Sequence, residues 1–89
     1  MERTAFNDIY EAHAADVRRF ARYLSGSEDL ADEITAETFL RAWTGNTPVR
    51  ATTARAYLLA IARNLVTDER RRAARLSPII DFQPARTAA

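Results

Sequence analysis

The chain has 89 residues and a net charge of +1, with 13 Lys or Arg, 12 Asp or Glu, one histidine and no cysteine. This length allows one small domain, the lack of cysteine excludes disulfides and thiolate metal sites, and a lone histidine disfavours a metal centre or a catalytic triad. Because no apolar run is long enough to span a bilayer and the N-terminus lacks a signal pattern, we expect a soluble cytoplasmic protein without a cofactor.

The first helical pattern runs from about residue 5 to residue 24. Its apolar stripe consists of Phe6, Ile9, Tyr10, His13, Val17, Phe20 and Leu24. Since His13 lies on this stripe, we interpret it as a residue at the core boundary rather than a functional group. Ser25-Gly26-Ser27 ends the pattern, because glycine supplies a C-terminal turn and serine can cap the next helix.

The second helical pattern spans about residues 28 to 43 and is strongly acidic at its start, where the helix dipole favours acids. Its core-facing side consists of Leu30, Ala31, Ile34, Thr38 and Ala42. Leu40 projects from the acidic side with Trp43 at its margin, which is a plausible docking patch for a basic helical partner. A single exposed leucine is also ordinary on a protein surface, so both interpretations stay open at this point.

The third helical pattern runs from residue 53 to residue 75, with Thr52 or Thr53 as its cap and Ser77-Pro78 as its stop. Its apolar stripe is Leu58, Ile61, Ala62, Leu65 and Val66. Roughly opposite this stripe lie Arg63, Thr67 and Arg70. One edge of the helix carries Tyr57, Asn64, Asp68, Arg71 and Arg75.

Three residues of that edge, Tyr57, Asn64 and Arg71, fall seven positions apart and therefore stack in a row. They offer an aromatic ring for stacking on an unpaired base, an amide for base edges and a guanidinium for phosphate. A solvated arginine face would carry the same charge. The interleaved tyrosine and asparagine favour a nucleic-acid surface over that alternative.

Charge is segregated along the chain. Five acids and no base lie in residues 28–37, whereas residues 50–75 hold seven arginines and two acids, a net +5. This polarity predicts one basic and one acidic partner. Three amphipathic helices that bury their stripes together make a small all-α three-helix bundle, with room for an extra short helical turn.

Two segments carry a family resemblance. Residues 36–43 (AETFLRAW), preceded by residues 30–34 (LADEI), closely resemble the second conserved region of extracytoplasmic-function (ECF) sigma factors. Residues 56–71 (AYLLAIARNLVTDERR) look like the helix with which that family melts promoters and reads the minus-ten element. The opening FNDIYEAH, residues 6–13, is similar to the family's first helix.

This resemblance implies a sigma region 2 domain at residues 1–76, followed by a linker or disordered tail at residues 77–89. It implies docking on the β′ clamp helices of core RNA polymerase through Asp29, Asp32, Glu33, Glu37, Leu40 and Trp43. It also implies binding of the single-stranded non-template minus-ten element by Asn46, Arg50, Tyr57, Arg63, Asn64, Thr67, Asp68, Arg71 and Arg72. The resemblance suggests an anti-sigma factor as a further partner. It suggests no membrane and no small-molecule substrate as partners of this chain. By the same analogy, the loop at residues 44–52 forms part of the pocket for an extruded base, although its turn chemistry also suits a plain connector.

The chain departs from the family pattern at several positions. Leu30 stands where the family often has an acid and Ala36 where it has glutamine, so we expect one or two polar contacts to polymerase to be missing. Tyr57 stands in place of the usual tryptophan, which keeps the stacking and loses area. The second helical domain of these factors, which reads the minus-thirty-five element, is absent, so we interpret the chain as the isolated promoter-melting domain.

We therefore expect a sigma-factor domain that acts in transcription initiation without catalysis of its own. The alternative is a helical protein-interaction module whose arginine-rich face binds an acidic protein. A small enzyme is disfavoured, because Asp32, Glu33 and Glu37 lack the histidine or other partner that a metal or acid-base site would need.

Overall fold

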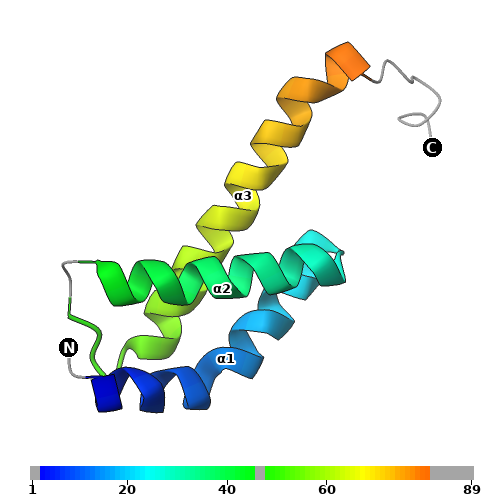
Figure 1. The fold of residues 1–89 in the computed structure, drawn as a ribbon. Helices are drawn as coiled ribbons and strands as arrows, with labels where there is room; N and C mark the ends of the chain where they lie inside the picture. Colours follow the sequence, from blue (N-terminus) through cyan, green and yellow to red (C-terminus); the bar gives the residue numbers. More distant parts are fainter. Residues whose placement is uncertain (1–2, 46–47, 81–89) are drawn as a thin grey trace.

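The computed structural model describes the backbone of residues 3–45 and 48–80 and the side chains of residues 6–45 and 48–75. It confirms the predicted all-α bundle, and the described residues contain no strand. Figure 1 shows two neighbouring helices with a third that crosses behind them and extends beyond them. The three helices are α1 (Arg3–Ser25), α2 (Glu28–Thr44) and α3 (Ala54–Ile80).

The turn between α1 and α2 has the chemistry that its sequence predicts. Gly26 has a φ of 72°, the left-handed conformation that glycine adopts without strain, and its amide donates to the carbonyl of Arg22 at 2.9 Å. The hydroxyl of Ser27 then accepts a hydrogen bond from the amide of Leu30 at 3.1 Å. Ser27 is therefore the N-cap of α2 and fixes where that helix begins.

The core is formed by all three helices, each of which contacts the other two. Its buried apolar residues are Ile9, Val17, Ala21, Ala31, Ile34, Phe39, Ala42, Ala54, Leu58, Ala62, Leu65 and Val66. The one buried polar side chain among the described residues is Thr38, whose hydroxyl donates to the carbonyl of Ile34 at 2.7 Å. Small alanines alternate with the larger side chains, so the helices can approach closely.

Two side chains of α1 and α2 lie differently from the predicted stripes. Phe39, which the sequence did not place in the core, is buried, whereas Tyr10 is 47% exposed. His13 is half-buried as expected, and its Nδ1 is buried without a hydrogen-bond partner in the described part of the chain. The predicted apolar stripes of α1 and α2 were therefore correct for the residues at their centre and wrong for Tyr10 and Phe39 at one edge.

The C-terminal end of α3 corrects the predicted end at residue 75, because the helix continues through Ser77 and Pro78 to Ile80. Proline lacks an amide hydrogen and so removes one helical hydrogen bond, the one to the carbonyl of Ala74. Ala74 is exposed, so water can satisfy that carbonyl. This part of α3 projects away from α1 and α2 (Figure 1).

The N-terminal end of α3 follows the prediction closely. The carbonyl of Thr53 accepts the first helical hydrogen bond, from the amide of Tyr57 at 3.0 Å. The amide of Thr53 itself donates to the carbonyl of Arg50 at 3.1 Å, which closes a turn just before the helix. Within the described residues, no helix has both the length and the apolar character needed to cross a membrane.

Candidate nucleic-acid and protein interfaces

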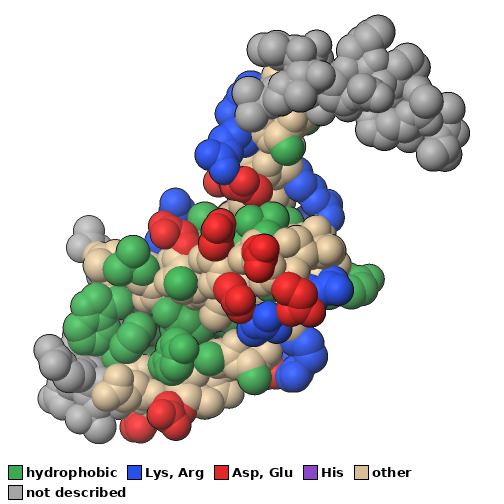
Figure 2. Space-filling model, turned by 45° about the vertical axis from the view of Figure 1, so that its right-hand side comes forward, with side chains coloured by type: hydrophobic (Ala, Val, Ile, Leu, Met, Phe, Trp, Pro, Cys, Tyr) green, Lys and Arg blue, Asp and Glu red, His purple; other side chains and the backbone are tan. Residues whose placement is uncertain are grey.

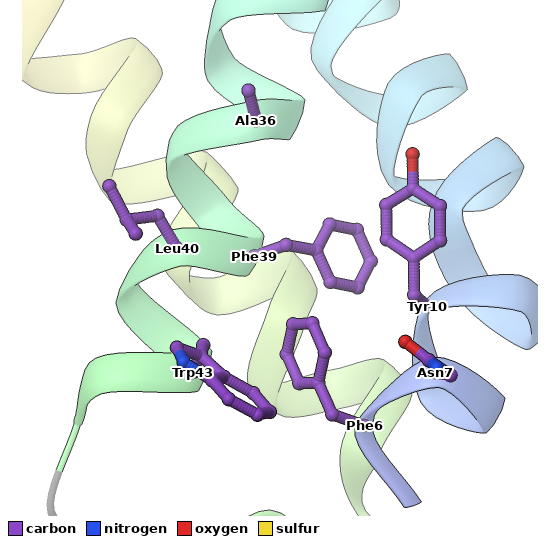
Figure 3. Close-up of a pocket in the computed structure, with 7 residues that line it drawn as sticks. All are labelled: Phe6, Asn7, Tyr10, Ala36, Phe39, Leu40 and Trp43. Carbon is purple, nitrogen blue, oxygen red and sulfur yellow. The ribbon is translucent and has the colours of Figure 1, made fainter. Parts of the chain in front are cut away.

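An apolar groove lies between the first half of α1 and the second half of α2, and it holds Leu40 and Trp43 (Figure 3). These two side chains are 54% and 41% exposed, which confirms that they project from the bundle. The groove has a volume of about 540 Å³. The residues that line this apolar groove are Phe6, Asn7, Tyr10, Ala36, Phe39, Leu40 and Trp43.

Aromatic rings set the shape of the apolar groove. Phe6 meets Trp43 edge to face with ring centres 4.5 Å apart, and Tyr10 meets Phe39 in the same way at 4.8 Å. Such T-shaped pairs are favourable beyond their buried area, so they hold the rings in place. The sequence assigned Phe6 and Tyr10 to the core and so missed them as groove residues. Their spacing of four residues at the margin of the stripe was the signal that could have shown this.

Acidic side chains lie next to the apolar groove on α2. Figure 2 shows the apolar patch beside a group of Asp and Glu side chains on the same face. Asp29 and Glu33 are exposed and have no ion-pair partner among the described side chains. Glu37 pairs with Arg41 one turn further along α2, at 3.0 Å. The predicted polymerase-binding residues thus share one helix but differ in how much of their charge is already neutralised.

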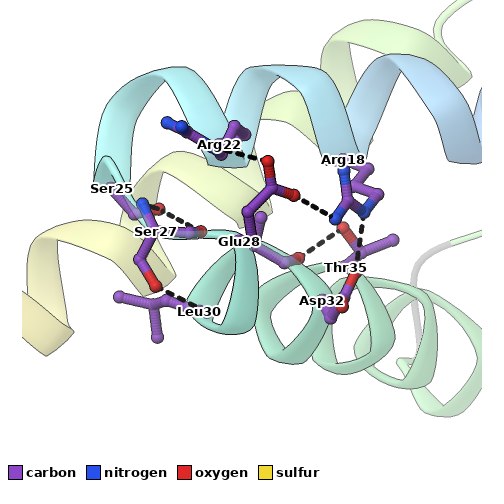
Figure 4. Close-up of polar contacts among 9 residues, drawn as sticks. Arg18, Arg22, Ser25, Ser27, Glu28, Leu30, Asp32 and Thr35 are labelled. Carbon is purple, nitrogen blue, oxygen red and sulfur yellow. Dashed lines mark hydrogen bonds and ion pairs between the residues drawn. The ribbon is translucent and has the colours of Figure 1, made fainter.

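Asp32 belongs to an ion-pair network that joins α1 to α2 (Figure 4). The Nε of Arg18 donates to Asp32 at 2.6 Å, and its Nη2 donates to Glu28 at 2.7 Å. Glu28 also accepts from the Nε of Arg22 at 3.2 Å. The hydrogen bond from Arg18, followed by that from Arg22, lowers the pKa of Glu28 below its ordinary value, and the Glu28 carboxylate in turn raises the pKa of Arg18.

The predicted DNA-binding residues of α3 fall into exposed and half-buried groups. Arg63, Asn64, Arg71 and Arg72 are exposed, as is Arg50 in the segment before α3, whereas Tyr57 and Thr67 are half-buried. Asn46 lies outside the described residues. The exposed members are therefore accessible to a ligand.

Tyr57 packs partly against the core, and its position links α3 to the end of α2. A Cβ added to Gly45 would lie 3.6 Å from the Tyr57 hydroxyl. Tyr57 is therefore next to the loop at residues 44–52, where the sequence predicts the pocket for an extruded base. The ring is held by packing on one side and partly open on the other.

Asp68 differs from the rest of the predicted DNA-binding set. It lines a groove between α2 and α3 together with Glu33, Glu37 and Glu69. Phosphate would be repelled there, so Asp68 is poorly placed for a backbone contact. No cluster of three or more acidic or histidine side chains in the described part of the chain is arranged to hold a metal ion.

Two arginines near Asp68 make contacts within the protein. Arg72 pairs with Glu69 at 2.6 Å, and Arg70 donates a hydrogen bond to the carbonyl of Leu24 at the end of α1. The hydrogen bond that Arg72 donates to the Glu69 carboxylate raises the pKa of Arg72 above its ordinary value. Arg70 thus fastens α3 to α1, whereas Arg63 and Arg71 have no ion-pair partner among the described side chains.

Comparison with known proteins shows which family this three-helix bundle belongs to. Residues 9–76 match the family model of Sigma-70 region 2. The chain belongs to this family. Among the relatives of this region 2 domain are the ECF RNA polymerase sigma factors SigL of Mycobacterium tuberculosis and BldN of Streptomyces coelicolor. The motifs at residues 30–43 and 56–71 therefore identified the family correctly, and no solved structure matches the chain at a significant level.

The region 2 domain matches these relatives over part of their length. SigL is 42% identical over 67 residues, which covers 73% of this chain and 38% of SigL. BldN is 38% identical over 69 residues, which covers 75% of this chain and 26% of BldN. The chain thus spans well under half the length of the curated relatives that it matches.

Proposed function

We propose that this domain docks on the β′ clamp helices of core RNA polymerase and recognises and melts the promoter minus-ten element during transcription initiation. The family and the ECF relatives support the general role. The observation that supports both contacts is the separation of charge and apolar surface between helices. Figure 2 shows the apolar and acidic side chains over the bundle and arginines along the projecting part of α3.

Docking on polymerase would use the apolar groove as its centre and the acids of α2 as its surroundings. The exposed parts of Leu40 and Trp43 offer apolar area that a helix could cover. Asp29 and Glu33 are the best placed for direct contact with basic residues, because their carboxylates are unpaired in the described part of the chain. Complementary charge of this kind speeds association and fixes the orientation of the partner.

Asp32 and Glu37 have a different role in this proposal. Both carboxylates are already paired, with Arg18 and Arg41 respectively. Their charge toward a partner is therefore partly neutralised, and they contribute mainly by holding the shape of α2 and its contact with α1. An anti-sigma factor that covered the apolar groove would block docking.

Binding of the minus-ten strand would use the exposed side of α3. Asn64 can donate to and accept from an unpaired base, and Arg63 and Arg71 can contact phosphates. Tyr57 lies next to the loop that follows α2, where an extruded base would be held. Extrusion of a base costs a few kcal/mol, which stacking and hydrogen bonds in such a pocket must offset.

The test is binding to a single-stranded non-template minus-ten oligonucleotide, compared with a scrambled oligonucleotide, over a range of salt concentrations. We expect preference for the matched strand and a salt-dependent affinity. A pull-down with core RNA polymerase measures the second contact. Equal binding of both oligonucleotides, together with no binding to polymerase, would favour the alternative helical module that binds an acidic protein.

A further inference from the structure

A second cleft lies between α1 and α3, on a side of α1 different from the one that borders the apolar groove. It has a volume of about 270 Å³ and is lined by Asp16, Arg19, Phe20, Tyr23, Arg55 and Leu59. Tyr23 is 82% exposed, the largest value among the exposed large hydrophobic side chains of the described residues. The polymerase and minus-ten contacts proposed above use none of these residues.

Two arginines from different helices converge on one carboxylate in this α1–α3 cleft. Asp16 accepts from Arg19 of α1 through Oδ1 and from Arg55 of α3 through Oδ2, the latter at 3.3 Å. The hydrogen bond from Arg55 is the main cause of the lowered pKa of Asp16, so its carboxylate is charged at neutral pH. The two guanidinium groups are thus already positioned to bind a single anion together.

Both arginines remain accessible while they hold Asp16. The side chains of Arg19 and Arg55 are 73% and 63% exposed. A phosphate carries more oxygen atoms than a carboxylate and suits the forked donors of arginine. An incoming phosphate could therefore bind the free donors of both arginines or displace Asp16.

The edge of α3 that faces α1 continues this basic surface. Leu59 and Arg63 follow Arg55 at intervals of four residues, so the three share one edge of the helix. The hydrogen bond from Arg70 to Leu24 shows that the same edge still faces α1 further along. Tyr57, only two residues from Arg55, lies on the opposite side of α3, so the edge with Arg55 is distinct from the edge with Tyr57 and Arg71, and Arg63 lies between them.

We propose that the α1–α3 cleft is a second nucleic-acid contact, which binds one strand with phosphate on Arg19 and Arg55 and a base against Tyr23. Asp16 occupies both arginines in the free protein and so lowers the affinity of this contact. An exposed aromatic ring beside paired arginines suits a nucleotide, which has both a phosphate and a flat base. The inference rests on the proposed function only in taking promoter DNA as the natural ligand.

The experiment measures the affinity of the full chain for a fluorescent oligothymidylate, which lacks the minus-ten sequence, by anisotropy over a range of salt concentrations. Asp16→Asn should raise the affinity about threefold or more and steepen the salt dependence, because two arginines are released for phosphate. Arg55→Gln should lower the affinity by a similar factor. Tyr23→Ala should lower it about fivefold or more, the loss expected for one stacked base.

Two control variants change charge by the same amount elsewhere. Asp8→Asn removes an exposed acid of α1, and Arg41→Gln removes an exposed arginine of α2 that is also ion-paired. Both should leave the affinity within about twofold of the unmodified chain, as expected for distant exposed charges. Thermal melting of each variant shows that it is folded, and Arg55→Gln keeps the test decisive if Asp16→Asn is unstable.

Three results would overturn the inference. The first is unchanged affinity in folded Arg55→Gln and Tyr23→Ala. The second is an equal gain for Asp16→Asn and Asp8→Asn, which would reflect net charge alone. The third is a parallel response with polyglutamate in place of the oligonucleotide, which would assign the cleft to an acidic protein. If the cleft variants respond as expected but the chain shows no preference for the minus-ten strand, the proposed function is wrong. The nucleic-acid contact at the α1–α3 cleft is then still supported.

Discussion

Tyr57 shows how a single residue can belong to the core and to a binding surface. Its ring packs partly against the buried residues, and its hydroxyl lies near Gly45 at the end of α2. The sequence predicted that the Tyr57 ring lies in a row with Asn64 and Arg71 on one edge of the helix. Asn64 and Arg71 are exposed. Periodicity could not predict how far the ring would be covered, because that depends on where α2 ends.

The first prediction is that Tyr57→Ala weakens binding of single-stranded or pre-melted minus-ten DNA about fivefold or more, while duplex binding changes little. The reason is that a ring can stack on a base only when the base is out of its pair, whereas arginines meet phosphate in either form. Tyr57→Trp should retain or improve single-strand binding, because its ring is larger. Gel-shift titrations with both DNA forms measure this.

The control for that experiment is Tyr57→Phe, which keeps the ring and removes the hydroxyl near Gly45. Because Tyr57 is half-buried, the alanine variant should also lose roughly 1–3 kcal/mol of unfolding free energy, so a melting curve must first show that it is folded. Equal losses on duplex and single strand in a folded variant would contradict a stacking role.

The second prediction separates base reading from phosphate binding on the exposed side of α3. Asn64→Ala should narrow the difference in affinity between matched and mismatched minus-ten oligonucleotides, because the amide can pair with a base edge. Arg71→Ala should lower both affinities by about the same factor and reduce the salt slope. The readout role of Asn64 is wrong if its alanine variant lowers matched and mismatched binding equally.

At the scale of the elements, α2 was the hardest helix to interpret from sequence. Its acids, apolar residues and Phe39 do not form one clean stripe, because α2 contacts the core on one side and borders two grooves. The sequence placed Asp29, Asp32, Glu33 and Glu37 outward, toward a partner. The structure shows that Asp32, like Glu28, pairs with Arg18 of α1, and sequence spacing alone cannot predict this pairing because it depends on how the helices cross.

The third prediction follows from the lowered pKa of Glu28, which Arg18 causes first and Arg22 second. A carboxyl with a lowered folded-state pKa stabilises the fold above its unfolded value, and this contribution disappears as the pH falls through the folded value. Glu28→Gln should therefore unfold more easily than the unmodified chain at neutral pH. The difference in unfolding free energy between this variant and the unmodified chain is the gap to be measured. It should close as the pH falls below 4.5, the ordinary pKa of a glutamate side chain.

Urea unfolding at a series of pH values, followed by circular dichroism, measures that gap. Glu11→Gln is the matched control, because Glu11 is an exposed acid without an ion-pair partner among the described side chains. It should show no comparable gap at neutral pH. A gap for Glu28→Gln that persists unchanged into acid would mean that the Arg18 network does not stabilise the fold.

For the whole molecule, the number of helices, their order and most of the core were predictable, because three separate stripes must be buried together. The end of α3 was predicted wrongly, since a proline near an exposed helix end costs one hydrogen bond rather than the helix. The apolar groove was also missed as a surface. It arises where α1 and α2 diverge, and only the packed helices show which aromatic rings stay open to solvent.

The fourth prediction uses this separation of surfaces across the molecule. Leu40→Ala and Glu33→Arg should each weaken binding to core RNA polymerase, because one removes apolar area at the groove and the other reverses an unpaired acid. Leu40→Ala should leave minus-ten strand binding within about twofold, because Leu40 lines the apolar groove and not the groove that Asp68 borders. Asp8→Arg, the same charge reversal at an exposed acid of α1 outside the proposed docking set, is the matched control for Glu33→Arg.

Affinity for core polymerase by surface plasmon resonance, and anisotropy with the minus-ten strand, give the two measurements on the same variants. Exposed substitutions of this kind usually change stability by less than about 0.5 kcal/mol, so a selective loss of polymerase binding would reflect the interface and not unfolding. Unchanged polymerase affinity in Leu40→Ala and Glu33→Arg would show that the clamp does not dock at the apolar groove. A parallel loss of both activities would instead mean that α2 and α3 act as one surface.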